Sequence, residues 1–346
     1  MTAPAYADFL ASKRVVVPAY GPRIDATAIH PKLFPFQRDL VRWAIRKGRA
    51  ALFADTGLGK TFMQLEWARL IGSPTLIVAP LAVARQTINE GHKLGIDVIY
   101  SRDGRPNGPL TITNYEMVEH FDPADFGAVI LNESSILKSL DGVTRRKLTE
   151  MFAATPYRLA CTATPAPNDI SEIGNHAEFL GVMSAVEMLS AFFIHGDMGG
   201  PGERQGWRLK GHAEDAFFRW LASWGMSIRK PSDLGYDDDG FILPPLTIAP
   251  RFVESGYVPD GQLFFGGLRG ITDRSAVRRA TLCDRVRVAA DLVNGSPDQW
   301  IVWHGLNDEG RMLAQRIPDS VLVEGSQPLE TKVQGLEAFQ DGRVRV

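Results

Sequence analysis

Short apolar runs alternate with stretches of helical periodicity through the first half of the chain. Apolar runs predict six strands, at residues 50–54, 75–79, 97–100, 110–113, 128–131 and 158–161. Helical patterns at 61–70 and 82–94 lie between them. Strands buried on both faces have nearly continuous apolar sequences, and their alternation with helices favours βαβ units. The predicted fold class is therefore α/β, with a mostly parallel, doubly wound sheet.

The pattern changes near residue 191. Six glycines between Gly196 and Gly211 predict a mobile loop, and residues 213–224 predict an aromatic helix. We interpret 191–240 as an insertion in the first domain. Four prolines within 243–261 stiffen the chain and indicate a domain border.

The remainder again alternates between the two kinds of pattern. Helices are predicted at 273–294, 308–315 and 329–340, and strands at 300–304, 321–323 and 343–346. About 75 residues are few for a complete α/β domain. The predicted division is an N-terminal extension (1–30), a first domain (31–242), a linker (243–270) and a partial second domain (271–346).

Composition narrows the classes of function. The chain has 38 Lys and Arg against 40 Asp and Glu, a formal net charge of −2, which excludes a strongly basic DNA-coating protein but not a local basic groove. Two cysteines exclude a disulfide framework and a four-thiolate zinc site. Without a bilayer-length apolar run or a signal peptide, we expect no membrane partner and a cytoplasmic location.

The sequence AALFADTGLGKT at residues 50–61 carries the clearest chemistry. An apolar strand leads into a loop with Thr56, Gly57 and Gly59, and a helix follows. The glycines let backbone N–H groups point at phosphate, Lys60 supplies a positive charge, and the Thr61 hydroxyl can ligate Mg²⁺. The pattern predicts ATP and Mg²⁺ as cofactors.

Six segments in order resemble superfamily-two helicases, most closely the Swi/Snf-like (DEAD/DEAH-type) branch of phage and prophage genomes. Besides the loop, the resemblance rests on FPFQ (34–37), VAPLAVARQTINE (78–90), ITNYEM (112–117), VILNESSILKS (129–139), LACTATPAPND (159–169) and WIVWHGLNDEGRML (300–313). It implies a RecA-like P-loop domain followed by an incomplete second RecA-like domain. It also implies a DNA-dependent ATPase that couples hydrolysis to movement on nucleic acid.

The resemblance assigns roles residue by residue. Gln37 contacts the adenine edge, and Glu133 positions or deprotonates the attacking water, with Lys60 on the phosphates. Motif III, which couples hydrolysis to movement, contributes Thr162, Ala163 and Thr164. The implied nucleic-acid contacts, most plausibly to double-stranded DNA, are Arg85, Thr113, Asn114 and Lys138. Phage or host replication and recombination proteins are expected partners.

The sequence departs from the family pattern at three places, of which the second and third point to impaired hydrolysis. Ala54 replaces the first glycine of the phosphate loop, and Asn132 replaces the aspartate that binds Mg²⁺ through water. A neutral amide oxygen lacks one negative charge beside a divalent ion. The arginine finger of the second domain is expected beyond Val346. The alternative is a nucleotide-dependent DNA-binding module without turnover; a P-loop ATPase with another substrate is a third possibility.

Several other residues are expected to be structural. Trp220 and Trp224 are spaced for packing on one helix face, and Cys161 is expected to be an inert core thiol. We expect the basic group Arg145–Lys147 to form a solvated helix face. The alternative is that it extends the nucleic-acid surface. The scattered histidines, His176 among them, are expected to be hydrogen-bonded polar residues.

Overall fold

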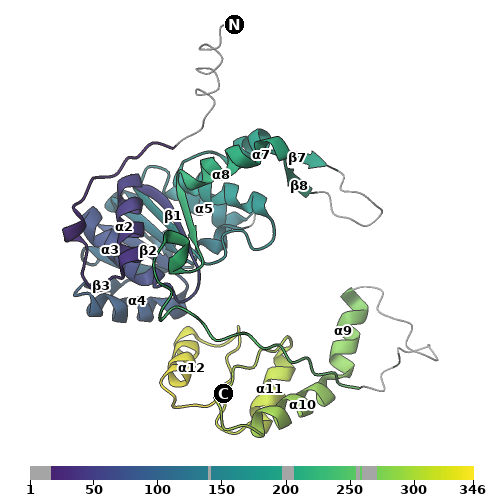
Figure 1. Cartoon of the computed structure of the whole chain (residues 1–346). Coiled ribbons are helices and arrows are strands. Elements are labelled where there is room, and N and C mark those ends of the chain that lie inside the picture. The colour runs from purple at the N-terminus through teal and green to yellow at the C-terminus, as the bar shows by residue number, and fades with distance from the viewer. Residues whose placement is uncertain (1–16, 139–141, 197–205, 255–257, 259–270) are drawn as a thin grey trace. The chain divides into compact units, whose positions relative to one another are not determined.

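Seven parallel strands form the central sheet of the first part of the chain, in the order β3-β4-β2-β5-β6-β1-β9 (Figure 1). The strands are β1 (Arg49–Ala54), β2 (Thr75–Ala79), β3 (Val98–Tyr100), β4 (Leu110–Asn114), β5 (Ala128–Asn132), β6 (Tyr157–Cys161) and β9 (Gly225–Ile228). The α/β fold class is confirmed. The six predicted strands are all present, each within one residue of its predicted bounds.

The computed structural model describes residues 17–138, 142–196, 206–254, 258 and 271–346. The chain divides into unit 1 (Met1–Leu243), which contains the sheet, and unit 2 (Pro244–Val346). Among the described residues, no helix combines the length and the apolar character needed to cross a membrane.

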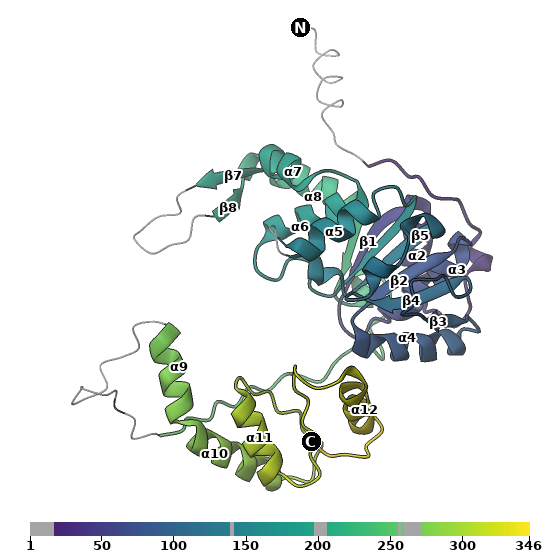
Figure 2. The same ribbon diagram turned by 180° about the vertical axis from the view of Figure 1, so that it is seen from behind.

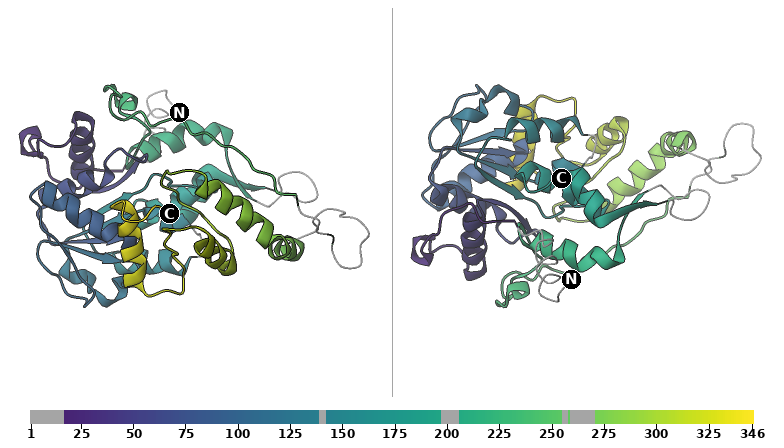
Figure 3. Two further views of the ribbon diagram at one scale, coloured as in Figure 1. Left: turned by 90° about the horizontal axis from the view of Figure 1, so that it is seen from below. Right: turned by 90° about the horizontal axis from the view of Figure 1, so that it is seen from above.

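Helices cover both faces of the sheet in unit 1 (Figure 3). One face packs against α2 (Pro35–Lys47), α3 (Lys60–Ile71) and α4 (Leu81–Lys93). The other packs against α5 (Val143–Met151), α6 (Ile173–Leu180), α7 (Ala185–Phe192) and α8 (Glu214–Ala222). Along β1, Leu52 and Ala54 face the first layer whereas Ala51 and Phe53 face the second. This two-residue alternation explains why the strand is apolar throughout.

Residues 191–240 build part of this framework. Strand β9 pairs in parallel with β1, from Ala51 opposite Gly225 to Ala54 opposite Ile228. The sequence interpretation missed β9, because GMSI is only four residues long and mixes apolar with small polar residues. Trp220 and Trp224 are buried with ring centroids 5.2 Å apart, which confirms that they pack.

A two-stranded antiparallel hairpin extends from the α7–α8 side of unit 1 (Figure 2). It consists of β7 (Phe193–Gly196) and β8 (Gly206–Leu209). The predicted glycine-rich mobile loop falls largely on 197–205, outside the described residues.

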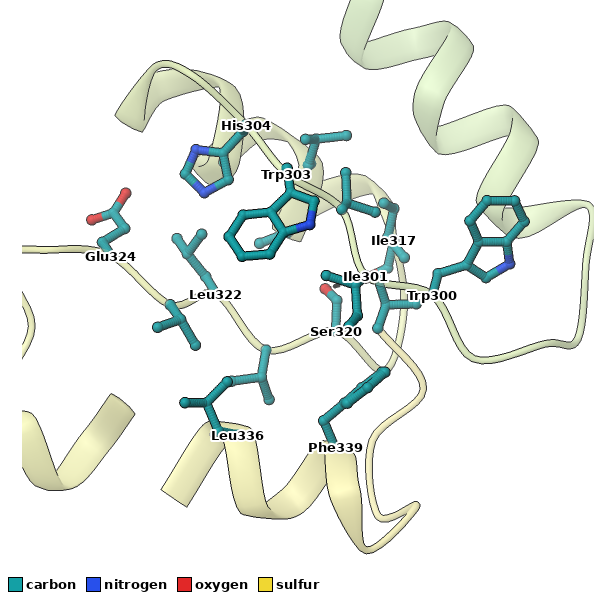
Figure 4. Close-up of a pocket in the computed structure, with 18 of the residues that line it drawn as sticks. Trp300, Ile301, Trp303, His304, Ile317, Ser320, Leu322, Glu324, Leu336 and Phe339 are labelled. Atoms are coloured by element: carbon teal, nitrogen blue, oxygen red, sulfur yellow. Dashed lines mark hydrogen bonds between the residues drawn. The ribbon is translucent and has the colours of Figure 1, made fainter. Parts of the chain in front are cut away.

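Unit 2 contains α9 (Ile271–Ala280), α10 (Leu282–Asn294), α11 (Asn307–Arg316) and α12 (Leu329–Gln340). The prediction of strands at 300–304, 321–323 and 343–346 is wrong, since no strand forms among the described residues of this unit. Backbone hydrogen bonds join these extended segments only near one end, from Trp300 N to Arg345 O (3.0 Å) and from Val321 N to Val346 O (2.8 Å). They otherwise line a cavity of about 620 Å³ (Figure 4). The predicted partial sheet is therefore not assembled.

The segment before α2 packs closely on the end of that helix. Tyr20 N and Gly21 N donate to the carbonyls of Lys47 and Arg46, both at 3.1 Å. A Cβ atom on Gly21 would lie 1.7 Å from the Ile45 carbonyl oxygen. Only glycine therefore fits at this crossing.

We predict that Gly21→Ala lowers the free energy of unfolding by about 1–3 kcal/mol, because the added methyl group forces the two backbones apart. Gly211→Ala is the matched control, since a Cβ there has nothing within 4 Å. Chemical denaturation of both variants measures the effect. Equal stability would contradict the close approach.

Candidate active site

The ends of three neighbouring strands bring the predicted site residues to one edge of the sheet. β6 lies between β5 and β1, and all three are parallel. The loops that follow them therefore emerge on the same side, where open α/β sheets bind their ligands. Two of these loops carry Glu133 and Thr162, and the loop after β1 leads to Lys60, the first residue of α3.

The loop after β1 has the conformation of an anion-binding turn. Gly57 and Gly59 have φ angles of 87° and 73°, in the left-handed region that favours glycine. Helix α3 begins at Lys60 with Gly59 as its N-cap, and no side chain caps its first N–H groups. Lys60 Nζ donates to the Ala54 and Asp55 carbonyls at 2.9 and 3.2 Å. An uncapped helix N-terminus beside a lysine is suited to phosphate.

Gln37 fixes this loop to α2. Its Nε2 donates to the Leu58 carbonyl at 2.9 Å, and its Oε1 accepts from Phe34 N at 2.9 Å. A Cβ on Gly59 would lie 2.4 Å from Gln37 Nε2, so a larger residue there would have to displace the Gln37 amide as well as adopt a φ of 73°. The amide thus supports the loop directly, and its contact with adenine stays a prediction.

An aromatic group beside Gln37 was not found from the sequence. Phe34 is 52% exposed and meets Phe241 edge to face, with ring centroids 4.9 Å apart. The Tyr236 hydroxyl donates to Asp39 Oδ2 at 2.5 Å, which brings the chain after β9 back to α2. About 200 residues separate the partners, and no local pattern announces such a contact. The exposed Phe34 ring offers a flat apolar surface next to the Gln37 amide.

Glu133 directly follows β5 in a left-handed conformation, with φ of 58°. Non-glycine residues pay a conformational cost there, and such strain concentrates at functional sites. Thr162 Oγ1 donates to Glu133 Oε2 at 3.3 Å and accepts from Thr164 N at 3.1 Å. Two of the three motif III residues are therefore connected to the predicted catalytic carboxylate.

Asn132 is buried at the end of β5, opposite Cys161 of β6. The backbone carbonyl of Asn132 accepts from the Tyr115 hydroxyl at 2.8 Å. The side-chain Nδ2 of Asn132 has no hydrogen-bond partner within the described chain. Burial raises the pKa of the Cys161 thiol to about 12, which agrees with an inert core thiol. The Glu133 carboxylate lies at the end of β6, where it accepts from Thr162 Oγ1.

Helix α6 holds the segment that follows Glu133. Ser134 Oγ and His176 Nε2 lie 3.1 Å apart, and both residues are fully buried. Asn175 Nδ2 donates to the carbonyls of Leu137 and Lys138, at 2.8 and 3.2 Å. Burial lowers the pKa of His176 to about 4, so its ring is neutral at pH 7. The position of Glu133 thus depends on a buried polar contact that the sequence does not mark.

The four predicted nucleic-acid contacts divide into two pairs. Arg85 and Lys138 are exposed, after the neighbouring strands β2 and β5. Thr113 is fully buried and donates to the Ser101 carbonyl at 2.9 Å. Asn114 is also buried, and its Nδ2 donates to Glu116 at 2.5 Å. Because Thr113 and Asn114 are enclosed in the sheet, we remove both from the candidate nucleic-acid surface.

Other side chains in the described ranges do not offer a preformed metal centre, since no three His, Cys, Asp or Glu residues gather there.

Two of the basic residues at 145–147 form ion pairs, Arg145 with Glu178 and Lys147 with Glu119. These pairs favour a structural role for this group.

The buried His176 makes stability depend on pH. The unfolded chain takes up its proton near pH 6.5 whereas the folded chain does so near pH 4, so stability decreases as the pH falls through this interval. The difference corresponds to about 3 kcal/mol. We predict that the stability advantage of the wild type over His176→Gln shrinks by about this amount between pH 7.5 and pH 4, measured by denaturation. Parallel pH profiles would contradict a buried neutral ring.

Comparison with known proteins finds relatives for part of the chain. The SWI/SNF-related matrix-associated actin-dependent regulator of chromatin subfamily A-like protein 1 of Xenopus laevis is 28% identical over 161 residues, 41% of this chain and 16% of the relative. The protein of the same name from Xenopus tropicalis is 26% identical over 170 residues, 44% and 18% of the two chains. DNA annealing helicase and endonuclease ZRANB3 of Mus musculus is 28% identical over 159 residues, 40% and 15%. The match thus spans less than a fifth of each relative.

Solved structures give weaker likenesses. The Sulfolobus solfataricus SWI2/SNF2 ATPase core in complex with dsDNA has a TM-score of 0.42 at 20% identity, covering 49% of this chain and 41% of that one. The UvsW helicase of bacteriophage T4 has a TM-score of 0.36 at 13% identity, covering 53% and 66%. No family model matches the chain. The similarity therefore rests on sequence, and over about two fifths of its length the chain is similar to SWI/SNF-related proteins and to a DNA annealing helicase.

Proposed function

We propose that this chain is an ATP-dependent motor of the Swi/Snf-like type, which couples ATP hydrolysis to movement on double-stranded DNA. The arrangement at the sheet edge is the observation that carries the proposal. The glycine-containing loop and Lys60 lie at the same edge of the sheet as Glu133, which has a φ of 58°, and Thr162 contacts that carboxylate. Binding and hydrolysis of a nucleoside triphosphate require these components.

The same residues suit a magnesium-bound nucleotide, with one charge missing. The Thr61 hydroxyl and the Asn132 amide oxygen would hold the ion, which neutralises charge on the β- and γ-phosphates when bound. The buried Asn132 Nδ2 lacks a partner in the described structure, so this side chain is not committed to a structural bond through that atom. An aspartate at position 132 would add a negative charge beside the ion. In our proposal, the asparagine that stands there instead slows turnover.

The remaining steps belong to the residues of the chain. Lys60 exchanges its two carbonyl partners for phosphate oxygens, while the N–H groups at the start of α3 face the triphosphate. The Glu133 carboxylate orients a water molecule toward the γ-phosphorus and accepts its proton as ADP leaves. Thr162 holds that carboxylate through its hydroxyl. The exposed Phe34 ring provides a surface for the base.

DNA contact is assigned to the exposed side chains at the same edge. Lys138 lies five residues after Glu133, and the Asn175 side chain binds the carbonyl of Lys138. A phosphate contact by Lys138 would therefore act on the segment that carries the catalytic carboxylate. Such backbone contacts position a duplex without reading its sequence.

A second candidate function is favoured by Asn132 itself. A neutral side chain at the metal position leaves nucleotide binding largely intact but weakens the stabilisation of charge during hydrolysis. In that case the chain is a nucleotide-dependent DNA-binding module without turnover.

We predict that Asn132→Asp raises DNA-stimulated ATP hydrolysis by about tenfold or more, because it restores a charged oxygen beside Mg²⁺. The measurement is the rate of phosphate release with and without duplex DNA. The double variant Asn132→Asp/Glu133→Gln is the control and is expected to stay inactive.

Three outcomes separate the candidates. A gain by Asn132→Asp alone supports a motor slowed at one ligand. Nucleotide binding without hydrolysis in either protein supports the binding module. Equal, robust turnover in both would contradict the assigned role of Asn132.

A separate prediction concerns the DNA surface. We expect Lys138→Gln to weaken duplex binding at low salt and to reduce the slope of log K against log salt by about one, as for the loss of a single phosphate contact. The control is Arg219→Gln, which removes the same charge from an exposed site on α8. Fluorescence anisotropy over a salt series measures both. An unchanged slope for Lys138→Gln would remove this residue from the interface.

A further inference from the structure

Three arginines line one small cavity on the outer side of α2. The cavity has a volume of about 240 Å³ and is lined by Arg23, Ile24, Arg42 and Arg46. Arg42 and Arg46 are one helical turn apart, so their side chains share a face of α2. Arg23 comes from the segment that packs against the end of this helix. No carboxylate belongs to the lining.

The backbone fixes this arrangement. The hydrogen bonds of Tyr20 and Gly21 to the last turn of α2 hold the N-terminal segment against the helix, and Gly21 allows the close approach. Ile24 packs against the hydrophobic core of the α2 side of the sheet. Arg23 is therefore held beside the other two arginines by contacts on both sides of it.

These arginines do not cap the helix. Gly48 N donates to the carbonyls of Ala44 and Ile45, and the carbonyls of Arg46 and Lys47 accept from the N-terminal segment. The last four carbonyls of α2 thus already have N–H partners. An arginine at a helix C-terminus often donates to such carbonyls, but here none of them needs a further donor.

The three guanidinium groups form no ion pair, although Asp25 lies within electrostatic reach of Arg42: hydrogen bonds from Thr27, and then the charge of Arg42, lower the pKa of its carboxyl. Within the described ranges, no hydrogen bond or ion pair involves the side chains of Arg23, Arg42 or Arg46. The nearby Asp25 accepts from Thr27 N and Thr27 Oγ1, at 2.8 and 2.7 Å. Arg38, on the same helix, instead donates to two backbone carbonyls. All three arginines are exposed, so water screens their mutual repulsion, and the cluster presents three guanidinium groups around one open space.

We propose that this cavity is a binding site for a phosphate group, distinct from the loop after β1. Planar guanidinium groups match phosphate oxygens in pairs, and three of them can neutralise a dianion. Gln37 lies near the other end of α2, about 14 Å along the helix from Arg46 at 1.5 Å per residue. The phosphate comes either from a free anion or from a nucleic-acid backbone.

The first experiment uses inorganic phosphate as the probe. Titrations followed by ³¹P NMR at constant ionic strength are made on the full chain carrying Lys60→Ala, which weakens the loop after β1. Adding Arg42→Gln and Arg46→Gln is expected to weaken phosphate binding by about tenfold or more, as for the loss of charge-assisted hydrogen bonds. Adding Arg219→Gln, which removes a remote exposed arginine, is expected to change it little.

Arg23→Gln provides an independent test outside the helix and is expected to weaken binding in the same direction. A second arm measures duplex DNA binding over a salt series. A smaller salt slope in the double arginine variant identifies the nucleic-acid backbone as the source, whereas an unchanged slope identifies a free anion. Equal phosphate affinity with and without the three arginines would overturn the proposal. Neither the phosphate titration nor the DNA titration depends on nucleotide binding by the loop after β1.

Discussion

The parallel register of β1, β6 and β5 is the constraint on which the candidate site depends. Leu52 pairs with Cys161, and Cys161 pairs with Asn132, so the three strands end side by side. The loop between β1 and α3, Glu133 and Thr162 follow these ends directly. A one-residue slip of β5 against β6 would separate Glu133 from Thr162 and would turn the strand's buried side chains to the wrong layers. The alternation of buried side chains that stabilises the sheet therefore also positions Glu133 and Thr162.

Polar contacts from outside the sheet adjust this arrangement. Gln37 reaches from α2 to the phosphate loop, and His176 reaches from α6 to the residue after Glu133. Both contacts are buried, where an unpaired polar group is costly, so each favours a single loop conformation. Some buried polar atoms here stay unpaired, since Asn132 Nδ2 and His176 Nδ1 have no partner in the described structure. Asn132 stands where the family resemblance places an aspartate, so its substitution is informative about function.

The sequence predicted the sheet of unit 1 well, because strands buried on both faces leave a continuous apolar record. It placed Glu133 and Thr162 in separate motifs, and the structure brings the two side chains into contact at 3.3 Å. It failed where long-range packing decides. Thr113 and Asn114 carry a polar motif, yet their strand lies inside the sheet, and β9 is too short to show a pattern. In unit 2 the apolar runs resemble strands, but their segments lack neighbours along most of their length and stay extended around a cavity.

We propose that the loop between β1 and α3 binds a magnesium nucleoside triphosphate. Calorimetric titration of ATP with Mg²⁺ into the chain and into its Lys60→Ala variant measures this binding. We predict that the wild type binds and that Lys60→Ala weakens binding by about tenfold or more, because a charged contact to phosphate is lost. Equal affinity in the two proteins, or no binding to the wild type, would contradict the assignment of this loop.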